Sequence, residues 1–251
     1  MKRGVIFAVA AWMACGAAAA GEVQEKAPMY SYQTIWTLPR ARWPQMQQAV
    51  SADRPILDRV LEQGALIAYG NDINPIHTAD GWTQVTWWAG PSLTGLFKVV
   101  DALASQPASS SVLTAAIRQQ DGIYISRYYN WWPGAYDGLF TYIGIYKLRA
   151  DAPPDAVATL SKDSIVPLLE MLLADRTLVE YEIDEEVFHT AAPRTFFVNY
   201  MALSPESLLK ANGALADRLD GRPVSSAAAS HLIDTPAYRG SLSRTLHATF
   251  K

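Results

Sequence analysis

Two acid–histidine pairs recur in this chain with the same spacing. Asp72 stands five residues before His77, and Asp184 stands five residues before His189. Carboxylate and imidazole both ligate metals, but a metal centre needs further ligands that converge on each pair. A structural role needs only hydrogen bonds from the histidine and the threonine after it to a hairpin backbone. The spacing therefore favours a structural role, keeps a pocket rim as an alternative, and predicts no metal site.

Two arginines, Arg127 and Arg244, are expected in the middle of strands beside apolar neighbours. A buried arginine is costly unless its charge is paired. Either the two side chains form internal salt bridges, for which Asp137 and Glu182 are candidate partners, or they offer a fixed cation to an anionic ligand group.

His247 is the best single candidate for a general base, and a haem ligand is the alternative chemistry for it. An exposed surface histidine is the structural alternative. We expect His247 on one strand face with a polar row that lines a cavity or meets water, formed by Ser241, Ser243, Thr245 and Thr249. Haem would also need a distal arginine and a propionate pocket, which the sequence does not locate, so no cofactor is predicted.

Aromatic residues are dense between Tyr124 and Tyr142. Many must fill the core, but tyrosine hydroxyls and indole N–H groups also suit a pocket for a flat aromatic or other apolar molecule. The predicted ligand-binding residues are Arg127, Tyr129, Trp88, Tyr142, Tyr200, Arg244 and His247. The chain has no G-x-S-x-G, H-E-x-x-H, P-loop or dinucleotide motif, so no reaction is named by a motif.

These residues lie on a duplicated unit. Residues 66–103 match residues 178–215 without a gap, 112 positions later. Identical pairs include Leu66/Leu178, Tyr69/Tyr181, Thr83/Thr195, Ser92/Ser204 and Leu103/Leu215. The match continues upstream, where residues 30–38 correspond to residues 140–148, and downstream, where Arg127 corresponds to Arg244.

Each copy predicts the element order β-α-β-β-α-β, a ferredoxin-like unit. In the first copy we expect strands at 30–38, 66–69, 82–89 and 122–129, a helix from Pro44 to Gln63 interrupted at Pro55, and a helix capped by Ser92. In the second we expect strands at 140–148, 177–183, 194–201 and 241–250, and helices at 154–174 and 204–217. Inserts at 106–120, with a short helix at 112–118, and 220–239 precede the last strands.

Two such units in one chain resemble the dimeric α+β barrel superfamily, over nearly the whole mature chain. The resemblance implies an α+β fold in which two antiparallel sheets face each other and helices cover the outside, an intramolecular version of a dimer. Members include cofactor-free monooxygenases and haem enzymes related to chlorite dismutase. Fusion of the two copies predicts a monomer, because each sheet covers the other.

The first twenty residues and the single cysteine lead to a prediction of cellular location. Lys2 and Arg3, the apolar stretch 5–14 and the small residues 16–20 predict a signal peptide at 1–20. Cys15, the only cysteine, keeps lipid anchoring as an alternative to cleavage, and the mature chain would have no cysteine. The predicted segments are an extension at 21–29, repeats at 30–132 and 140–251, and a linker at 133–139.

The mature chain would carry a formal charge of −5, which argues against nucleic acid, and no later segment is long enough for membrane insertion. We therefore expect a periplasmic or secreted protein that binds a small apolar or aromatic molecule between its sheets, as a cofactor-free monooxygenase-like enzyme if it is catalytic. One alternative is a non-catalytic envelope protein that acts through an exposed aromatic patch at Trp131–Trp132. Another is a haem-binding barrel.

Overall fold

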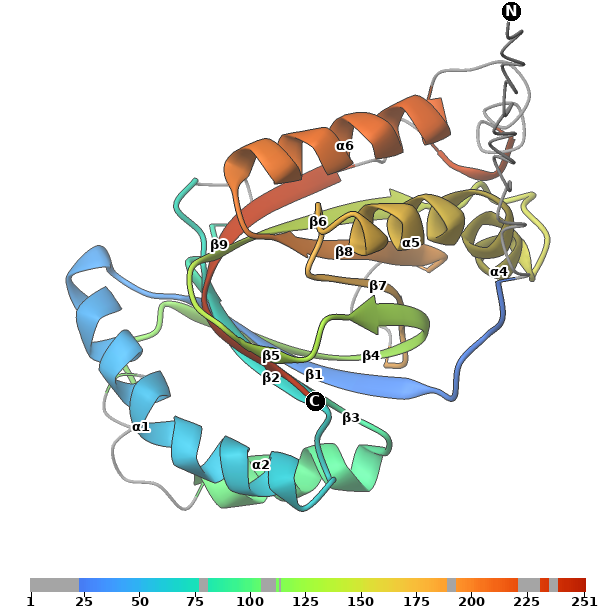
Figure 1. Ribbon diagram of the computed structural model, residues 1–251. Helices are drawn as coiled ribbons and strands as arrows, with labels where there is room; N and C mark the ends of the chain where they lie inside the picture. Colours follow the sequence, from blue (N-terminus) through green and yellow to red (C-terminus); the bar gives the residue numbers. More distant parts are fainter. Residues whose placement is uncertain are drawn as a thin grey trace, which may run out of the picture.

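The computed structural model describes residues 23–76, 81–104, 112, 114–188, 193–220, 231–234 and 239–251. His77, His189 and most of both inserts lie outside these residues. The described chain forms one antiparallel sheet of nine strands (Figure 1). Eight of these strands form a closed barrel, and the ninth, short strand pairs at its edge. This is the predicted dimeric α+β barrel, made by the two halves of one chain.

The first repeat follows the predicted order. Its elements are β1 (Met29–Thr37), a 3-10 turn η1 (Arg40–Arg42), α1 (Trp43–Glu62), β2 (Ala68–Ile73), β3 (Gln84–Gly90), α2 (Leu93–Ala104) and β4 (Arg118–Trp131). The Ser92 hydroxyl accepts a hydrogen bond from the Gly95 amide at 3.1 Å, so the predicted cap of α2 is confirmed.

The second repeat follows a short strand β5 (Gly134–Tyr136). Its elements are β6 (Leu139–Lys147), α4 (Ala156–Leu160), a π turn η2 (Ser161–Ile165), α5 (Val166–Ala174), β7 (Glu180–Glu186), β8 (Thr195–Ala202), α6 (Pro205–Asp220) and β9 (Arg239–Phe250). The Ser204 hydroxyl caps α6 by accepting from the Ser207 amide at 3.1 Å.

One predicted interruption is wrong. Helix α1 continues through Pro55 as one helix of 20 residues. Proline removes the amide that would bond the carbonyl of Ser51, but Ser51 and Pro55 are both exposed, so water can solvate that carbonyl. The predicted helix at 112–118 also ends too late, because Arg118 already begins β4.

Two seams join the repeats. The strand order is β2-β3-β1-β4-β7-β8-β6-β9, and β9 pairs again with β2 to close the circle. The last strand of each repeat thus pairs with the second strand of the other, as β4–β7 and β9–β2. In Figure 1, α1 and α2 cover the first sheet from below, and α4, α5 and α6 cover the second from above.

Beta-bulges interrupt both seams. The β4–β7 register shifts between Ser126 and Tyr128, and the β9–β2 register shifts between Thr245 and His247. A bulge inserts one residue and so moves the following side chains to the other face of the strand. Thr245 is fully buried inside the barrel beside Thr141, whereas His247 lies on the outer face beside Tyr69.

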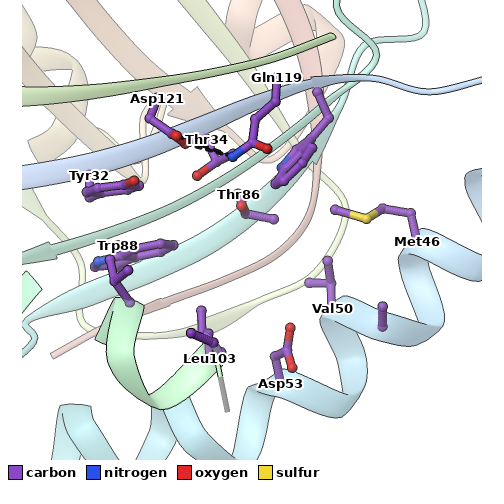
Figure 2. A pocket seen from close by; sticks show the side chains of 14 residues that line it. Tyr32, Thr34, Met46, Val50, Asp53, Thr86, Trp88, Leu103, Gln119 and Asp121 are labelled. Atoms are coloured by element: carbon purple, nitrogen blue, oxygen red, sulfur yellow. Dashed lines mark hydrogen bonds between the residues drawn. The ribbon is translucent and has the colours of Figure 1, made fainter. Parts of the chain in front are cut away.

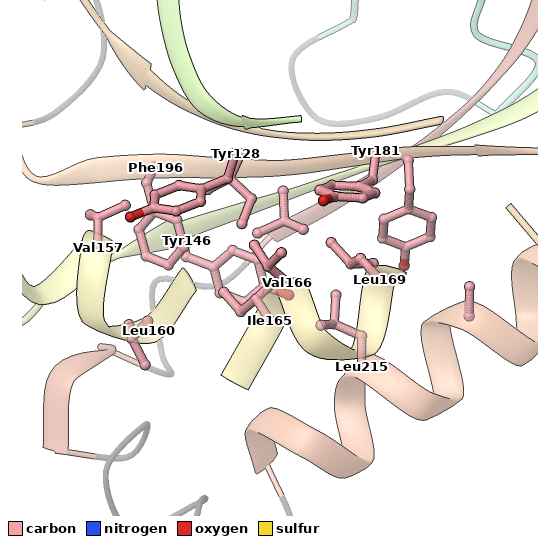
Figure 3. Close-up of a cluster of buried hydrophobic side chains, with 14 of the residues drawn as sticks. Tyr128, Tyr146, Val157, Leu160, Ile165, Val166, Leu169, Tyr181, Phe196 and Leu215 are labelled. Carbon is pink, nitrogen blue, oxygen red and sulfur yellow. The ribbon is translucent and has the colours of Figure 1, made fainter. Parts of the chain in front are cut away.

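The core has separate layers inside and outside the barrel. The largest cluster packs the second sheet against α4, α5 and α6, and Figure 3 shows Tyr146 and Phe196 of the sheet above Leu160, Ile165 and Leu169. A smaller cluster lies between the first sheet, α1 and α2. Inside the barrel, Met29, Leu139, Met201 and Phe250 belong to a third cluster.

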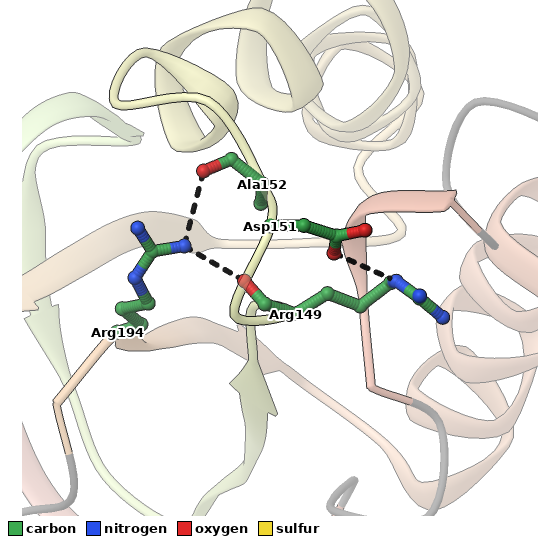
Figure 4. Close-up of polar contacts among 4 residues, drawn as sticks. All are labelled: Arg149, Asp151, Ala152 and Arg194. Atoms are coloured by element: carbon green, nitrogen blue, oxygen red, sulfur yellow. Dashed lines mark hydrogen bonds and ion pairs between the residues drawn. The ribbon is translucent and has the colours of Figure 1, made fainter.

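A guanidinium holds the connection from β6 to α4. Arg194 adopts a left-handed backbone conformation with φ of 68°, which is unusual for a residue with a Cβ. Its Nη1 donates to the carbonyls of Arg149 at 2.8 Å and Ala152 at 3.0 Å (Figure 4). Asp151, in the same turn, pairs with Arg149 at 3.1 Å. These contacts fix where the helical layer of the second repeat begins.

Candidate functional site

A cleft of about 280 Å³ opens between the first sheet and helices α1 and α2. It lies on the outer face of the sheet, not in the barrel interior where the sequence predicted a ligand. Figure 2 shows Tyr32, Thr34, Thr86 and Trp88 on the sheet side and Met46, Val50, Asp53 and Leu103 on the helix side. The same period-two spacing that builds the strands puts these β1 and β3 side chains on one face.

The floor of the cleft is an aromatic pair. The rings of Tyr32 and Trp88 stack with centroids 4.6 Å apart and planes 6° apart. The Trp88 indole N–H donates to the Leu96 carbonyl at 3.3 Å, which fixes the ring. Burial raises the pKa of Tyr32 above its ordinary value, and nearby Asp121 raises it further. A flat ring system can pack against this surface.

Two buried donors, one on a residue that lines the cleft and one on its neighbour across the sheet, have no hydrogen-bond partner among the described residues. They are the Trp36 indole nitrogen and the Gln84 amide nitrogen, which belong to residues paired directly across β1 and β3. Trp36 is 6% exposed and Gln84 is 3% exposed. An unpaired buried donor costs free energy, and an acceptor atom on a ligand would remove that cost.

A smaller cavity of about 50 Å³ adjoins the cleft on the side of the β9–β2 seam. The two spaces share the lining residues Val50, Asp53, Thr86, Trp88 and Leu103. The smaller one is also lined by Arg54, Leu57, Tyr69, Gly70, Asn71, Trp87 and His247. The wide end is therefore apolar with the carboxylates of Asp53 and Asp121, and the narrow end combines the Asp53 carboxylate with an imidazole and a guanidinium.

His247 is held at both ring nitrogens. Nδ1 lies 2.7 Å from an Asp137 carboxylate oxygen, and Nε2 lies 3.0 Å from the Thr249 hydroxyl. The Tyr69 hydroxyl next to this group donates to Asp58 at 2.5 Å. Burial, followed by the bond to Asp58, raises the pKa of Tyr69 to about 12, so Tyr69 stays protonated at neutral pH.

The second repeat fills the corresponding space. Trp36 and Gln84 of the first repeat correspond to Tyr146 and Phe196, which stack with centroids 5.2 Å apart. Thr86 corresponds to Val198, which is fully buried. The polar side chains of Gln84 and Thr86 are thus replaced by the apolar side chains of Phe196 and Val198, while Trp36 is replaced by a tyrosine that stacks on Phe196. At these corresponding positions of the described chain, the first repeat borders a cleft and the second is packed.

A second unusual region lies inside the barrel. Asp72, Glu180, Glu182 and Asp184 belong to strands β2 and β7, and we call them the acidic cluster. Asp72, Glu180 and Asp184 are at most 4% exposed. Asn199 donates to Asp184 at 2.7 Å and to Glu182 at 3.2 Å, and Trp87 donates to Asp72 at 3.1 Å.

Burial raises the pKa of every member of the acidic cluster. The pKa of Asp72 rises to about 6, and those of Glu180 and Asp184 rise well above their usual range because each is also close to other carboxylates. Within the described part of the chain, no group of three or more His, Cys, Asp or Glu residues is arranged to hold a metal ion. The arrangement therefore favours protons shared among the carboxylates.

Only two of the predicted ligand-binding residues meet at the cleft, Trp88 and His247. Tyr142 and Tyr200 pack on the outer face of the second sheet, and Tyr129 lies with the cluster inside the barrel. The prediction that Arg127 and Arg244 are buried is wrong. Both are exposed, Arg127 at the β4 bulge and Arg244 over the Phe140 ring at 5.3 Å.

The structure also bears on two further alternatives from the sequence, a haem ligand at His247 and an exposed aromatic patch at Trp131–Trp132. His247 does not fit a haem ligand, because the cavity beside it, about 50 Å³, is far smaller than a porphyrin. Trp131 and Trp132 do not form an exposed patch. Both are half-buried, and their indoles donate to the carbonyls of Lys251 and Leu173. Among the described helices, none combines the length and apolar character needed to cross a membrane.

Sequence reasoning missed most of the cleft, and it named Asp72, Glu182 and Asp184 for other roles without bringing them together in one cluster. The alternation of Glu180, Glu182 and Asp184 along one strand was a usable signal, because residues two apart share a face. For the cleft, the signal was the contrast between repeats at positions such as Gln84 and Phe196.

Comparison with known proteins shows similarity in structure only. No protein-family model and no curated protein matches the sequence. A candidate monooxygenase from Fusobacterium nucleatum has a TM-score of 0.63 at 8% identity, covering 90% of this chain and 95% of that one. A candidate monooxygenase from Lactobacillus acidophilus has a TM-score of 0.59 at 8% identity, covering 90% and 97%.

An anthrone oxidase-like protein is also similar, with a TM-score of 0.51 at 8% identity over 90% of this chain and 94% of that chain. These structures share the dimeric α+β barrel fold. At such low identity the likeness establishes only the fold of this chain, a dimeric α+β barrel within one polypeptide. The activity has to be inferred from the residues of the site.

Proposed function

We propose that this protein binds a small apolar or aromatic molecule in the cleft between its first sheet and helices α1 and α2. The observation that carries the proposal is the contrast between the repeats. The first repeat keeps a cleft of about 280 Å³ lined by Trp36, whose indole nitrogen has no partner among the described residues, while Tyr146 and Phe196 stack at the corresponding place in the second. This volume is at the lower end for ligand sites, typically about 300 Å³ or more, and suits a small ligand.

The reaction we propose is a cofactor-free, monooxygenase-like oxidation of that ligand. The fold shared with candidate monooxygenases and an anthrone oxidase-like protein supports this choice. The aromatic floor of Tyr32 and Trp88 supports a flat substrate. Oxygen uptake in metal-free buffer, measured with hydroxyaromatic compounds that bind, tests the reaction separately from binding.

Binding is tested with 2-naphthol and naphthalene, by quenching of tryptophan fluorescence and by thermal shift. We expect the wild-type protein to bind and to melt at a higher temperature with ligand. Thr86→Phe, which fills the cleft from β3, should weaken binding at least about tenfold, equivalent to about 1.4 kcal/mol. Leu209→Phe, on the exposed face of α6, is the matched control. Equal binding by both variants would place the ligand elsewhere.

We also propose export, on the basis of residues 1–20 alone. Expression of the full chain in a bacterial host, followed by fractionation and N-terminal sequencing, tests this. A mature protein that begins near residue 21 in the periplasmic fraction supports it, and an uncleaved cytoplasmic protein argues against it.

A further inference from the structure

We propose that His247, oriented by Asp137, is the catalytic proton acceptor for a ligand bound in the cleft. The inference rests on the proposed function, because it needs a ligand in the cleft. It adds a step to that function: the ligand presents a weakly acidic O–H or C–H group at the narrow end and loses that proton to the imidazole.

The hydrogen bonds of His247 determine which nitrogen is basic. An ionised carboxylate can only accept hydrogen bonds, so Nδ1 carries the ring hydrogen and donates it in a hydrogen bond to Asp137 at 2.7 Å. In the neutral ring, Nε2 is then the acceptor, and the Thr249 hydroxyl at 3.0 Å donates to it. The Asp137 side chain is 76% exposed while that of His247 is 9% exposed, so the carboxylate orients the ring from the surface. Such a carboxylate also stabilises the imidazolium that forms when Nε2 takes a proton.

The position of His247 gives a ligand access to it. His247 lines the cavity of about 50 Å³ that adjoins the wider cleft. This space is large enough for a hydroxyl or another small acidic group, while the apolar part of the ligand lies on Trp88 in the cleft. In the proton transfer, the O–H or C–H bond of the ligand breaks and its electron pair stays on the ligand. A new N–H bond forms at Nε2, where the ligand hydrogen has replaced the Thr249 hydroxyl.

The surrounding charges favour this orientation of the ligand. Arg54 and Asp53 of α1 line the cavity with His247, and Asp58 of α1 faces it through Tyr69 of β2. Asp121 lies at the opposite, wide end of the cleft. Arg54 and the imidazolium stabilise a developing anion in the small cavity, against Asp53 and Asp58, whereas the wide end has only the carboxylates of Asp53 and Asp121 among its described charged lining groups.

The other seam is an internal control. Asn130 corresponds to His247, and Trp132 corresponds to Thr249. Asn130 donates to both carboxylate oxygens of Glu170 at 2.9 and 3.1 Å. An asparagine is thus sufficient to complete the β4–β7 seam, where the neighbouring space is filled. The ionisable ring occurs only at the seam beside the open cleft, which supports a chemical role for it.

The test uses 4-nitrophenol with the full chain, because its anion is coloured and its neutral form is not. Binding is measured by tryptophan quenching, and the ionised fraction of the bound probe is measured by absorbance as the pH is varied. In the wild type we expect the bound probe to be half ionised at a pH about one unit lower than in His247→Asn, a roughly tenfold difference in the ionisation equilibrium. Asp137→Asn, a change at an exposed side chain, should remove part of this effect, and Thr249→Val should keep it.

Failure of ligand binding and failure of the proton-acceptor role give different results in this experiment. If 4-nitrophenol, 2-naphthol and naphthalene all fail to bind the wild type, the proposed function fails and this inference fails with it. If the probe binds wild type and variants equally well but ionises at the same pH in the wild type, His247→Asn and Asp137→Asn, only the proton-acceptor role is overturned. Because Asp137→Asn alters no buried side chain, it gives this answer even if His247→Asn does not fold.

Discussion

Trp88 and Tyr200 occupy corresponding positions in the two repeats, but they have opposite surroundings. Trp88 stacks on Tyr32 and borders an open cleft. Tyr200 is fully buried, lies 5.4 Å from the ring of Tyr142, and donates its hydroxyl hydrogen to Asn212 at 2.9 Å. The duplicated scaffold has therefore divided its roles, because one repeat provides packing while the other retains space.

The acidic cluster should make stability fall as the pH rises. Burial raises the pKa of Asp72 in the folded state to about 6, above the ordinary aspartate value of 3.8, so protonation favours the folded state. Its contribution is complete below pH 4 and is lost as the pH rises through 6. Glu180 and Asp184 extend the loss to higher pH, because burial raises their pKa values further. Urea unfolding at pH 5, 6.5 and 8 should show a decrease of about 2 kcal/mol or more.

Asp184→Asn provides the control for that prediction. Asparagine keeps an oxygen that can accept from Asn199, but it cannot ionise. The variant should be more stable than the wild type at pH 8 and should lose less stability between pH 5 and pH 8. A wild-type free energy of unfolding that is flat or rises over this range would show that the cluster does not hold protons.

Truncation of Phe196 in the second repeat should lower the free energy of unfolding far more than truncation of the corresponding Gln84 in the first repeat. Phe196 is fully buried against Tyr146, so Phe196→Ala should cost about 3–5 kcal/mol of unfolding free energy. Gln84→Ala removes a buried amide nitrogen that lacks a described partner, and we expect a cost below about 1 kcal/mol. Chemical denaturation of both variants measures the difference, and equal costs would contradict the division of roles.

The tyrosine–carboxylate pair at the β4–β7 seam should stabilise the joined repeats. Tyr181 is 1% exposed and donates to Glu170 at 2.5 Å. Tyr181→Phe leaves that carboxylate with fewer donors, and we expect a loss of about 1.5–3 kcal/mol. Because Asn130 donates to the same carboxylate, the costs of Tyr181→Phe and Asn130→Ala should not add. A double-mutant cycle measures this coupling, and strict additivity would show that the three groups act independently.

Arg194 should show separate costs for its backbone conformation and its side chain. Arg194→Ala loses the bonds to the Arg149 and Ala152 carbonyls and keeps a Cβ at φ of 68°. Arg194→Gly loses the same bonds but relieves the steric cost, so it should be about 1 kcal/mol more stable than the alanine variant. Urea denaturation compares the two. An alanine variant as stable as the glycine variant would mean that the left-handed conformation is not retained.

The architecture could be predicted from the sequence because the patterns that encode it lie within each repeat. The gapless match of Tyr69 with Tyr181 and Ser92 with Ser204 revealed the duplication, and alternation along the strands placed most elements within a few residues. Helix caps were predictable for the same reason, because a serine hydroxyl and the amide three residues later are neighbours in the chain. The closed barrel followed from two sheets that each needed a cover.

Only the tertiary structure decided where the site lies. The bulge before His247 moves that ring to the outer face, away from Ser243 and Thr245, and a single inserted residue leaves no trace in an alternating pattern. The partner of His247 is Asp137, 110 residues away, and the cleft depends on side chains from two helices and three strands. Sequence periodicity reports which residues share a face. It does not report which distant face they meet, because that depends on the volumes and hydrogen bonds of the packed whole.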